Sequence, residues 1–252
     1  MVKVALLQLR SQKNRAESIE HVIRMLRTVG AAEPDIVCLP ELWYPKAVNS
    51  FEREFKHIID MAKEQNMIVI SGAFLEKIDN TLYISAPVIS RDGMILGRQF
   101  KIHPFGNQRN AVKSGTTMEM FDGGSFKFGI GICYDVVFPE VSRALARKGA
   151  EIVFFPSKIS KKGTEPWHMY VQVRALENRI PVVAPNVCGD MYGGRSILVA
   201  FDYDKKTDIA VPRRIVGSIK DQTFALDIDL DRVRKIREAR LKDLKSNLYV
   251  SL

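Results

Sequence analysis

Cys133 is the first residue whose position suggests chemistry. The segment FGIGICYDVVFPEVSRALARKG places it where an apolar, glycine-containing strand ends and a helix soon begins. The carboxyl ends of strands in open α/β sheets form the crevice in which ligands bind. A thiol exposed at such an elbow meets backbone N–H groups and a helix N-terminus, which both favour the nucleophilic thiolate. The alternative is a small buried hydrophobic residue, the usual role of a free cysteine.

Two charged residues follow other strand-like segments in comparable places. Glu41 comes directly after DIVCLP, among Leu39, Leu42 and Trp43, where a partly desolvated carboxylate suits a general base. Lys101 ends the strand-like MILGRQFK. Taken singly, Glu41 is more readily a surface or capping acid and Lys101 a solvated lysine, because most charged side chains are exposed.

Hydrophobic spacing predicts the elements that must hold these residues. Asn14 with Glu17 predicts a capped helix over 14–29, and Gly30 predicts a left-handed residue at its end. A second amphipathic helix is expected over 51–62, and a meander of strands at 68–77, 81–90 and 94–101. Further strands then alternate with helices at about 138–148, 165–178 and 231–240. The pattern predicts helices layered on two packed, mixed sheets.

Length and composition predict one domain over residues 1–252, because 252 residues with 46% hydrophobic content can bury a large core. No apolar run is long enough to cross a bilayer, and the N-terminus leads directly into a strand-like pattern, so we expect a cytoplasmic protein. Its three cysteines contain no CxxC pair, and its four histidines lack ligand spacing. We therefore expect free thiols and no metal site.

The charge is basic but weakly localised. Lys and Arg exceed Asp and Glu by 38 − 29 = 9. Acidic residues interrupt the basic run RVRKIREARLKDLK, as they do on an ordinary solvated helix. No nucleic-acid recognition motif accompanies the charge, so we expect no nucleic-acid partner and no membrane partner.

The blocks around the three candidate residues resemble the nitrilase, or carbon–nitrogen hydrolase, superfamily. VALLQL opens the chain, LPELW surrounds Glu41, RQFKIHPF surrounds Lys101 and GIGICYDVVFPEVSR surrounds Cys133. PW, then RALENR near Glu177, and then NVCGDMYGGRSIL continue the family's order of blocks. The resemblance implies an α/β fold, a four-layer αββα sandwich that pairs as αββα–αββα dimers. It also implies that the C-terminal segment KSNLYVSL extends toward the partner.

The chemistry that this resemblance implies is the hydrolysis of a small linear amide without metal or cofactor. Glu41 accepts the thiol proton, Cys133 attacks the amide carbon, and Lys101 with the backbone N–H of Tyr134 stabilises the developing anion. Ammonia departs, and a thioester on Cys133 remains. Water activated by Glu41 then releases the acid. An N-carbamoyl-amide hydrolase fits almost equally well, whereas a nitrilase is the less favoured alternative.

One departure from the family pattern concerns a second glutamate, which in many members lies between the lysine and the cysteine, shortly before a glycine. In FGNQRNAVKSGTTMEMF, Lys113 takes that place before Gly115, and Glu119 falls after the glycine. An ammonium there repels Lys101 and favours an anion, so the substrate is expected to carry a carboxylate held by Arg109 and Lys113. Alternatively, Lys113 points into solvent. The missing glutamate also supports a catalytically weak binding protein of the same fold.

The remaining candidates are interpreted as structural. Cys38 lies inside a strand and is expected in the core, and Cys188 is expected near the pocket as a bystander. Two pairs with i,i+3 spacing are expected to form supports on helices, Glu140–Arg143 and Arg174–Glu177. Four apolar residues belong either to the core or to a dimer surface: Val141, Leu145, Tyr170 and Val173.

Overall fold

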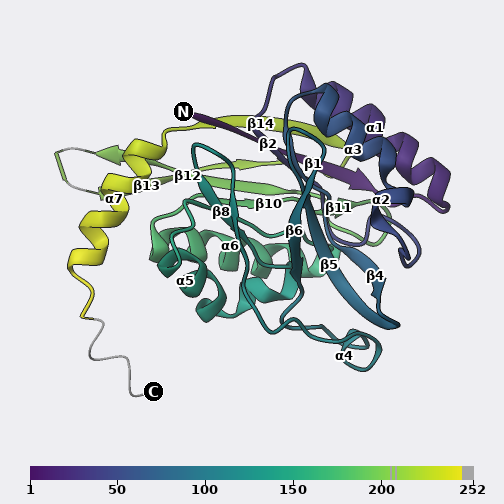
Figure 1. The fold of residues 1–252 in the computed structure, drawn as a ribbon. Helices are drawn as coiled ribbons and strands as arrows, with labels where there is room; N and C mark the ends of the chain where they lie inside the picture. Colours follow the sequence, from purple (N-terminus) through teal and green to yellow (C-terminus); the bar gives the residue numbers. More distant parts are fainter. Residues whose placement is uncertain (205, 208, 246–252) are drawn as a thin grey trace.

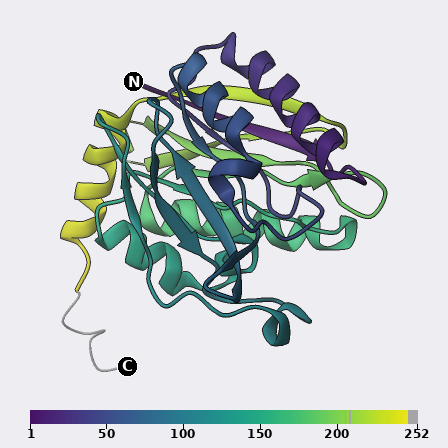
Figure 2. The ribbon, with the colours of Figure 1, turned by 45° about the vertical axis from the view of Figure 1, so that its right-hand side comes forward.

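Two β-sheets face each other, with helices on their outer sides (Figures 1 and 2). The computed structural model describes residues 1–204, 206–207 and 209–245. Residues 246–252, which hold most of the segment expected to reach a partner subunit, lie outside the described residues. In the described part of the chain, no helix is both long and apolar enough to cross a membrane.

The first sheet contains eight strands of the described chain, and its core order is β11-β1-β2-β3-β5-β4. Strand β14 pairs antiparallel with β1, and β6 pairs antiparallel with β5. The bounds are β1 Val2–Arg10, β2 Ile36–Cys38, β3 Ile68–Ile70, β4 Phe74–Ile78, β5 Thr81–Ile89, β6 Ile95–Phe100, β11 Val187–Cys188 and β14 Gln222–Ile228. Parallel and antiparallel pairs both occur, so the sheet is mixed, as predicted.

The second sheet contains six strands of the described chain in the order β13-β12-β10-β9-β8-β7. Its bounds are β7 Met120–Asp122, β8 Lys127–Ile130, β9 Ile152–Phe154, β10 Val182–Ala184, β12 Ile197–Asp204 and β13 Ile209–Val216. Strands β8, β9 and β10 are parallel, so their carboxyl ends lie at one edge of the sheet.

Helices cover both outer faces. Their bounds are α1 Arg15–Gly30, α2 Phe51–Glu54, α3 Lys56–Glu64, α4 Gln108–Ala111, α5 Pro139–Arg147, α6 Thr164–Asn178 and α7 Leu230–Lys242, with short 3-10 helices η1 at Cys133–Val137 and η2 at Lys161–Gly163. Helices α1 and α3 pack on the first sheet, and α5 and α6 pack on the second (Figures 1 and 2). The expected αββα layering is confirmed.

Strand β1 shows how the sequence produces these layers. Alternate side chains of a strand point to opposite faces of its sheet. Val4 and Leu6 enter the core between the two sheets, whereas Ala5 and Leu7 enter the core beneath α1 and α3. Because apolar side chains occupy both faces, β1 reads as a continuous hydrophobic run, as expected for a strand buried on both sides.

Cys38 and two of the apolar helix residues lie in these cores. Cys38 belongs to the core between the sheets, as predicted. Val141 and Leu145 are buried between α5, α6 and the second sheet. Tyr170 and Val173 instead have exposed fractions of 38% and 45%, so only these two of the four residues remain on the surface.

Three local predictions about helices were wrong. The helix expected over 51–62 is divided into α2 and α3 at Phe55, whose φ of −111° is not helical. Gly30 has no positive φ and ends α1 in ordinary helical geometry. Its lack of a Cβ instead leaves room for the side chain of Gln65. Glu140 and Arg143 form no ion pair in the described structure, and Arg143 donates a hydrogen bond to the Glu177 carbonyl.

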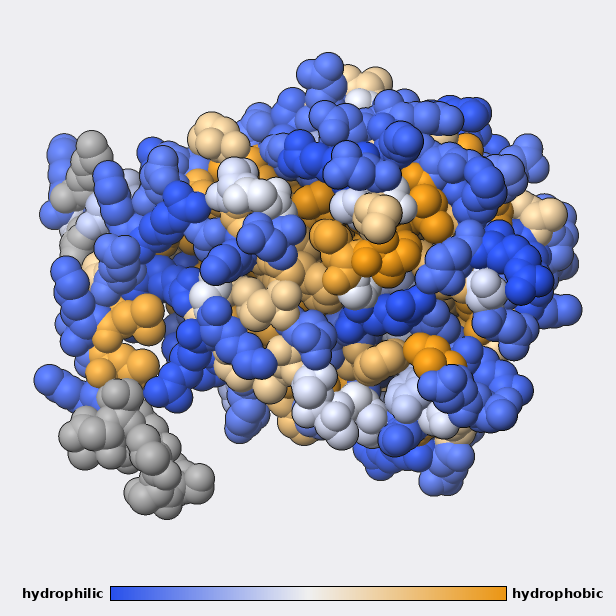
Figure 3. All heavy atoms as spheres, in the orientation of Figure 1, coloured by the Kyte–Doolittle hydropathy of each residue, from blue (hydrophilic) through white to orange (hydrophobic). Residues whose placement is uncertain are grey.

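The visible face of the molecule divides by hydropathy. In Figure 3, hydrophilic residues cover both ends of the visible face, and hydrophobic residues gather near its middle.

Candidate active site

Cys133 lies at a sharp turn between β8 and η1. Its φ is +51°, a left-handed conformation that is uncommon for residues other than glycine. The N–H of Cys133 donates to the Pro156 carbonyl at 2.9 Å, and this bond fixes the turn against the end of β9. The predicted elbow is confirmed, but the thiol is not exposed, because the residue has an exposed fraction of only 8%.

Glu41 is held by the loop that follows β2. The segment predicted as one strand over 68–77 breaks into β3 and β4 at Gly72, which has a φ of +76°. A Cβ at Gly72 would collide with the Pro40 carbonyl oxygen and with the Trp43 ring. The glycine therefore lets the Glu41 loop pack against the break between the strands. The N–H of Trp43 Nε1 donates to the Ser71 carbonyl at 2.8 Å and anchors the same contact.

Lys101 follows β6 and reaches Glu41 across the interior. Its Nζ donates to Glu41 Oε1 at 2.7 Å, and the exposed fractions of the two side chains are 1% and 2%. Nζ also donates to Gln108 Oε1 at 3.0 Å. The same Gln108 oxygen accepts the Phe105 N–H at 3.0 Å, which ties α4 to the lysine.

The segment 156–159 connects the parts of the site. The Glu41 N–H donates to the Ser157 carbonyl at 3.2 Å, the Cys133 N–H donates to the Pro156 carbonyl, and the Lys158 backbone lowers the pKa of the Cys133 thiol. Next in the chain, the Ile159 N–H donates to Asn186 Oδ1 at 2.8 Å. These bonds place the thiol and the carboxylate in a fixed relation to the end of β9.

Asp135 and Arg174 hold the two sides of the turn. The fully buried Asp135 carboxylate accepts the N–H groups of Ile132 and His103, each at 2.8 Å, and so connects the Cys133 turn to the chain just after Lys101. Arg174 of α6 donates to the carbonyls of two residues of η1 and to Glu177 Oε1 at 3.1 Å. The predicted Arg174–Glu177 pair is confirmed, and its arginine also supports the turn.

Electrostatics set the resting protonation of the site. Burial, and next the Glu41 carboxylate, raise the pKa of the Cys133 thiol well above its ordinary value. Burial alone lowers the pKa of Lys101, but Glu41 and Cys133 outweigh it, so the pKa is raised. The Glu41 carboxylate is thus close enough to the thiol to raise its pKa. At neutral pH the site therefore holds a thiol and an ammonium, not the ready thiolate that its position predicted.

Other residues selected from the sequence lie away from this cluster. Arg109 and Lys113 are exposed, and in the described structure neither side chain bonds to Glu41, Lys101 or Cys133. Gln108 contacts Lys101 Nζ, and Lys113 is exposed, in agreement with the alternative that Lys113 points into solvent.

The Tyr134 backbone N–H meets no acceptor among the described contacts. An oxygen that gains negative charge next to the Cys133 sulfur would find this donor close by in the chain.

Cys188 and the histidines make structural contacts. The Cys188 thiol donates to Asp221 Oδ1 at 3.0 Å, and His21 Nε2 lies 3.3 Å from Asp221 Oδ2. His103 Nδ1 contacts Asp135 at 2.9 Å, and His168 Nε2 contacts the Arg195 carbonyl at 2.7 Å. His57 lines a surface groove.

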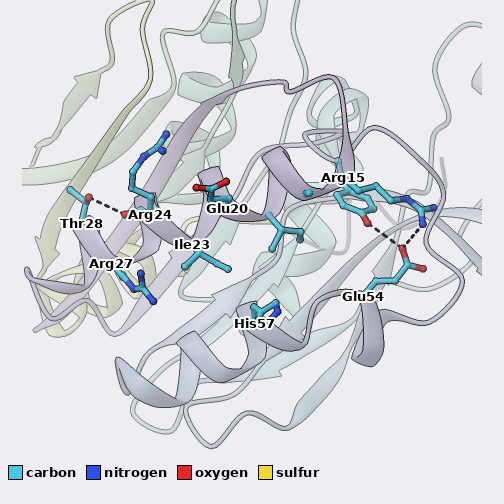
Figure 4. Close-up of a pocket in the computed structure, with 11 residues that line it drawn as sticks. Arg15, Glu20, Ile23, Arg24, Arg27, Thr28, Glu54 and His57 are labelled. Atoms are coloured by element: carbon cyan, nitrogen blue, oxygen red, sulfur yellow. Dashed lines mark hydrogen bonds and ion pairs between the residues drawn. The ribbon is translucent and has the colours of Figure 1, made fainter.

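A groove of about 940 Å³ lies elsewhere, between α1 and the α2–α3 region (Figure 4). Some of its polar side chains bond to one another or to its backbone. Arg15 pairs with Glu54 at 3.4 Å, and Thr28 bonds to the Arg24 carbonyl at 3.0 Å (Figure 4). Glu41, Lys101 and Cys133 are not among its lining residues.

The sequence analysis missed Gln108, Asp135 and Lys158. Only a carboxylate was sought as the second partner of Lys101, so the amide of Gln108 was passed over. Asp135 lies two positions after Cys133, and its fixed spacing in CYD was an available signal. Lys158 follows the strand-like EIVFFPS, in the same kind of place as Glu41 and Cys133, and that position was the signal.

The αββα layers and the buried cluster of thiol, carboxylate and ammonium together define a hydrolase of the nitrilase superfamily. Residues 3–237 match the family described as carbon–nitrogen hydrolase, and the chain belongs to that family. Membership confirms the expected class of reaction, the hydrolysis of a carbon–nitrogen bond.

Individual relatives are distant but extend along most of the chain. The deaminated glutathione amidase of Dictyostelium discoideum is 27% identical over 94% of this chain and 90% of its own length. The omega-amidase of Mus musculus is 24% identical over 98% of this chain and 96% of its own. A carbon–nitrogen hydrolase structure from Helicobacter pylori G27 superposes with a TM-score of 0.85 at 23% identity, covering 98% of this chain and 97% of that chain.

Proposed function

We propose that the protein is an amidase that cleaves a small linear amide to an acid and ammonia, with Cys133 as nucleophile, Glu41 as general base and acid, and Lys101 as the cation that stabilises the oxyanion. The observation that carries this proposal is the buried contact of 2.7 Å between Lys101 Nζ and Glu41 Oε1, beside a buried Cys133 thiol whose pKa is raised by that carboxylate. Amidase names among the relatives support the amide over the carbamoyl and nitrile alternatives.

Acylation begins with transfer of the Cys133 proton to Glu41. This transfer is required because the buried thiol holds its proton at neutral pH. As the sulfur attacks the carbonyl carbon, the Lys101 ammonium and the Tyr134 N–H donate to the developing oxyanion. When the tetrahedral intermediate collapses, Glu41 returns the proton to the leaving nitrogen, ammonia departs and a thioester on Cys133 remains.

Deacylation reverses the proton movements. Glu41 takes a proton from water while the water oxygen attacks the thioester carbon, and the same donors stabilise the second oxyanion. Collapse expels the Cys133 thiolate, which recovers its proton from Glu41 as the acid is released. The Lys158 N–H directed at the sulfur stabilises the thiolate in both half-reactions.

Replacement of the nucleophile tests this proposal. We expect Cys133→Ala to abolish hydrolysis of a panel of small amides while leaving the fold intact. Cys188→Ala is the matched control, because Cys188 is also buried but bonds to Asp221. Intact-mass measurement during turnover should detect an acyl adduct on the wild type and none on Cys133→Ala. Turnover by Cys133→Ala, or loss of turnover only in Cys188→Ala, would remove the proposal.

The location and assembly that we propose are the cytoplasm and a homodimer. A reducing compartment suits a mechanism that needs a free thiol at Cys133. For the dimer, α6 presents exposed apolar residues, of which Met169 is 65% exposed and Val173 is 45% exposed. Burial of this face against a second copy would remove it from water. Light scattering on the wild type and on Val173→Asp tests the dimer, which should dissociate in the variant.

A further inference from the structure

We propose that the side-chain amide nitrogen of Gln108 donates a hydrogen bond to the oxyanion, which makes Gln108 a catalytic residue beside Glu41, Lys101 and Cys133. This inference rests on the proposed amidase function and adds a third donor to its oxyanion site. The donor is Nε2, at the opposite end of the amide from the oxygen that contacts the lysine.

Two neighbouring donors fix the orientation of the Gln108 amide. Lys101 Nζ and the Phe105 backbone N–H each donate to Gln108 Oε1 at 3.0 Å. An ammonium and a backbone N–H can only donate hydrogen bonds, so the amide atom between them is the oxygen. The oxygen and nitrogen of this amide cannot be exchanged, and both of its N–H groups point away from Lys101 and Phe105.

The nitrogen of the same amide has no partner in the described part of the chain. Oε1 of the half-buried Gln108 side chain accepts two hydrogen bonds, but Nε2 donates none. The buried side-chain atoms that lack a partner belong to other residues of the described chain, so Nε2 is not enclosed in packed protein. Its two N–H groups are therefore available to a ligand, although the adjacent Lys101 is 1% exposed.

Two contacts hold the loop that carries Gln108 against the turn that carries the nucleophile. The Phe105 and Tyr134 rings have centroids 4.8 Å apart, and the Asp135 carboxylate accepts the His103 N–H at 2.8 Å. Tyr134 directly follows the nucleophile, and Phe105 lies three residues before Gln108. These contacts keep the amide near both other donors of the proposed oxyanion site, the lysine ammonium and the Tyr134 N–H.

The attack on the substrate produces the charge that this donor would stabilise. As the Cys133 sulfur bonds to the carbonyl carbon, the π electron pair moves onto the oxygen, and Glu41 holds the thiol proton. An oxyanion on the Lys101 ammonium lies within reach of Nε2, because one amide carbon joins Nε2 to the oxygen that the ammonium contacts. On collapse the pair re-forms the carbonyl bond, the C–N bond breaks, and the nitrogen leaves with its electrons and the proton from Glu41.

An amide serves this position in a way that a carboxylate could not. The Gln108 oxygen accepts from Lys101 while its nitrogen donates to the oxyanion, so one side chain orients one donor and supplies another. A carboxylate would only accept hydrogen bonds, and its charge would oppose the oxyanion. The chemical type of the side chain at position 108, and not only its size, should therefore determine kcat.

Gln108→Glu separates the two roles of the amide, because it keeps an acceptor for Lys101 at nearly the same size but removes the donor. We would measure kcat and KM for the small amide that the wild type cleaves fastest. In Gln108→Glu, kcat should fall about tenfold or more, and KM should change less, because the donor acts on the transition state. Asn110→Asp makes the same chemical change at an exposed position of α4 and should leave kcat unchanged.

The matching thioamide separates loss of the donor from the added charge. Repulsion by a new carboxylate acts on a sulfur anion as on an oxygen anion, whereas sulfur accepts hydrogen bonds only weakly. Gln108→Glu should therefore lose less kcat on the thioamide than on the amide. Gln108→Met removes the donor without adding charge and should show the same difference, so the result does not depend on the folding of one variant.

The outcomes distinguish this inference from the proposed function. Wild-type kcat in Gln108→Glu, or equal losses on the amide and the thioamide in both variants, would overturn the role of Nε2 and leave the amidase function intact. If the wild type hydrolyses no amide and forms no adduct on Cys133, the proposed function falls, and this inference falls with it.

Discussion

Replacement of Glu41 by glutamine should make the Cys133 thiol more acidic and the enzyme less active. In the wild type, burial and next the Glu41 carboxylate raise the pKa of this thiol. Glutamine keeps the size of the side chain but removes its charge, so one of the two raising influences is lost. The Lys101 ammonium, no longer paired with Glu41, would then attract the thiolate and lower the pKa further.

Coulomb's law gives the expected size of the pKa change. Two unit charges about 4 Å apart interact by about 4 kcal/mol at an effective dielectric constant of about 20. This energy corresponds to a change of about a thousandfold in the ionisation constant of the thiol. The loss of the general base should at the same time lower kcat/KM by about a hundred- to ten-thousandfold.

Thiolate absorbance in the ultraviolet, titrated against pH, measures the ionisation directly. Subtraction of the signal from Glu41→Gln combined with Cys133→Ala isolates the contribution of this thiol. Glu119→Gln is the matched control, because its carboxylate is exposed and should change neither the titration nor turnover. An unchanged or higher midpoint in Glu41→Gln would refute the view that this carboxylate keeps the proton on sulfur.

Two other predictions concern the hydrogen bonds and the buried thiols. Gln108→Leu should lower kcat about tenfold, because Lys101 loses an acceptor that orients it. Arg109→Leu on the same helix is the control and should leave kcat unchanged. Equal losses of kcat in the two variants would contradict the orienting role of Gln108. The free energy of unfolding should fall as pH rises above 9.0, the ordinary thiol pKa. The folded protein keeps the protons of Cys38 and Cys133 there and the unfolded chain loses them, at about 1.4 kcal/mol per pH unit for each thiol. Denaturant titrations on both sides of pH 9.0 check this, and a flat profile would contradict it.

Much of the fold could be predicted because buried apolar residues recur in the sequence at the spacing of the helix or strand that carries them. Helix α1 begins as expected, since the Asn14 side chain accepts the Glu17 N–H at 2.9 Å. The breaks at Phe55 and Gly72 were missed because the apolar spacing continues across them. Tertiary contacts set these breaks, and at Gly72 the contact is with a loop distant in sequence. The single domain over 1–252 and the dimer stay predictions.

The site could be predicted less completely. Glu41, Lys101 and Cys133 were placed by strand ends and by family resemblance, and the structure brings them together. The protonation of Cys133 could not be foreseen, because it depends on how deeply the turn is buried. A loop separates Gln108 from Lys101, and the sequence does not predict the course of that loop. The contact between the two side chains could therefore be found only in the structure.

The pairing of β1 with β14 has a consequence for biosynthesis. Residues 2–8 leave the ribosome long before residues 222–228, with which they pair. Until then, one edge of β1 in the first sheet lacks that partner, and it is apolar on both faces. An unpaired apolar edge invites association with other chains. Until residue 228 is made, the nascent chain is exposed to aggregation, and a stop codon before residue 222 should yield an aggregating product.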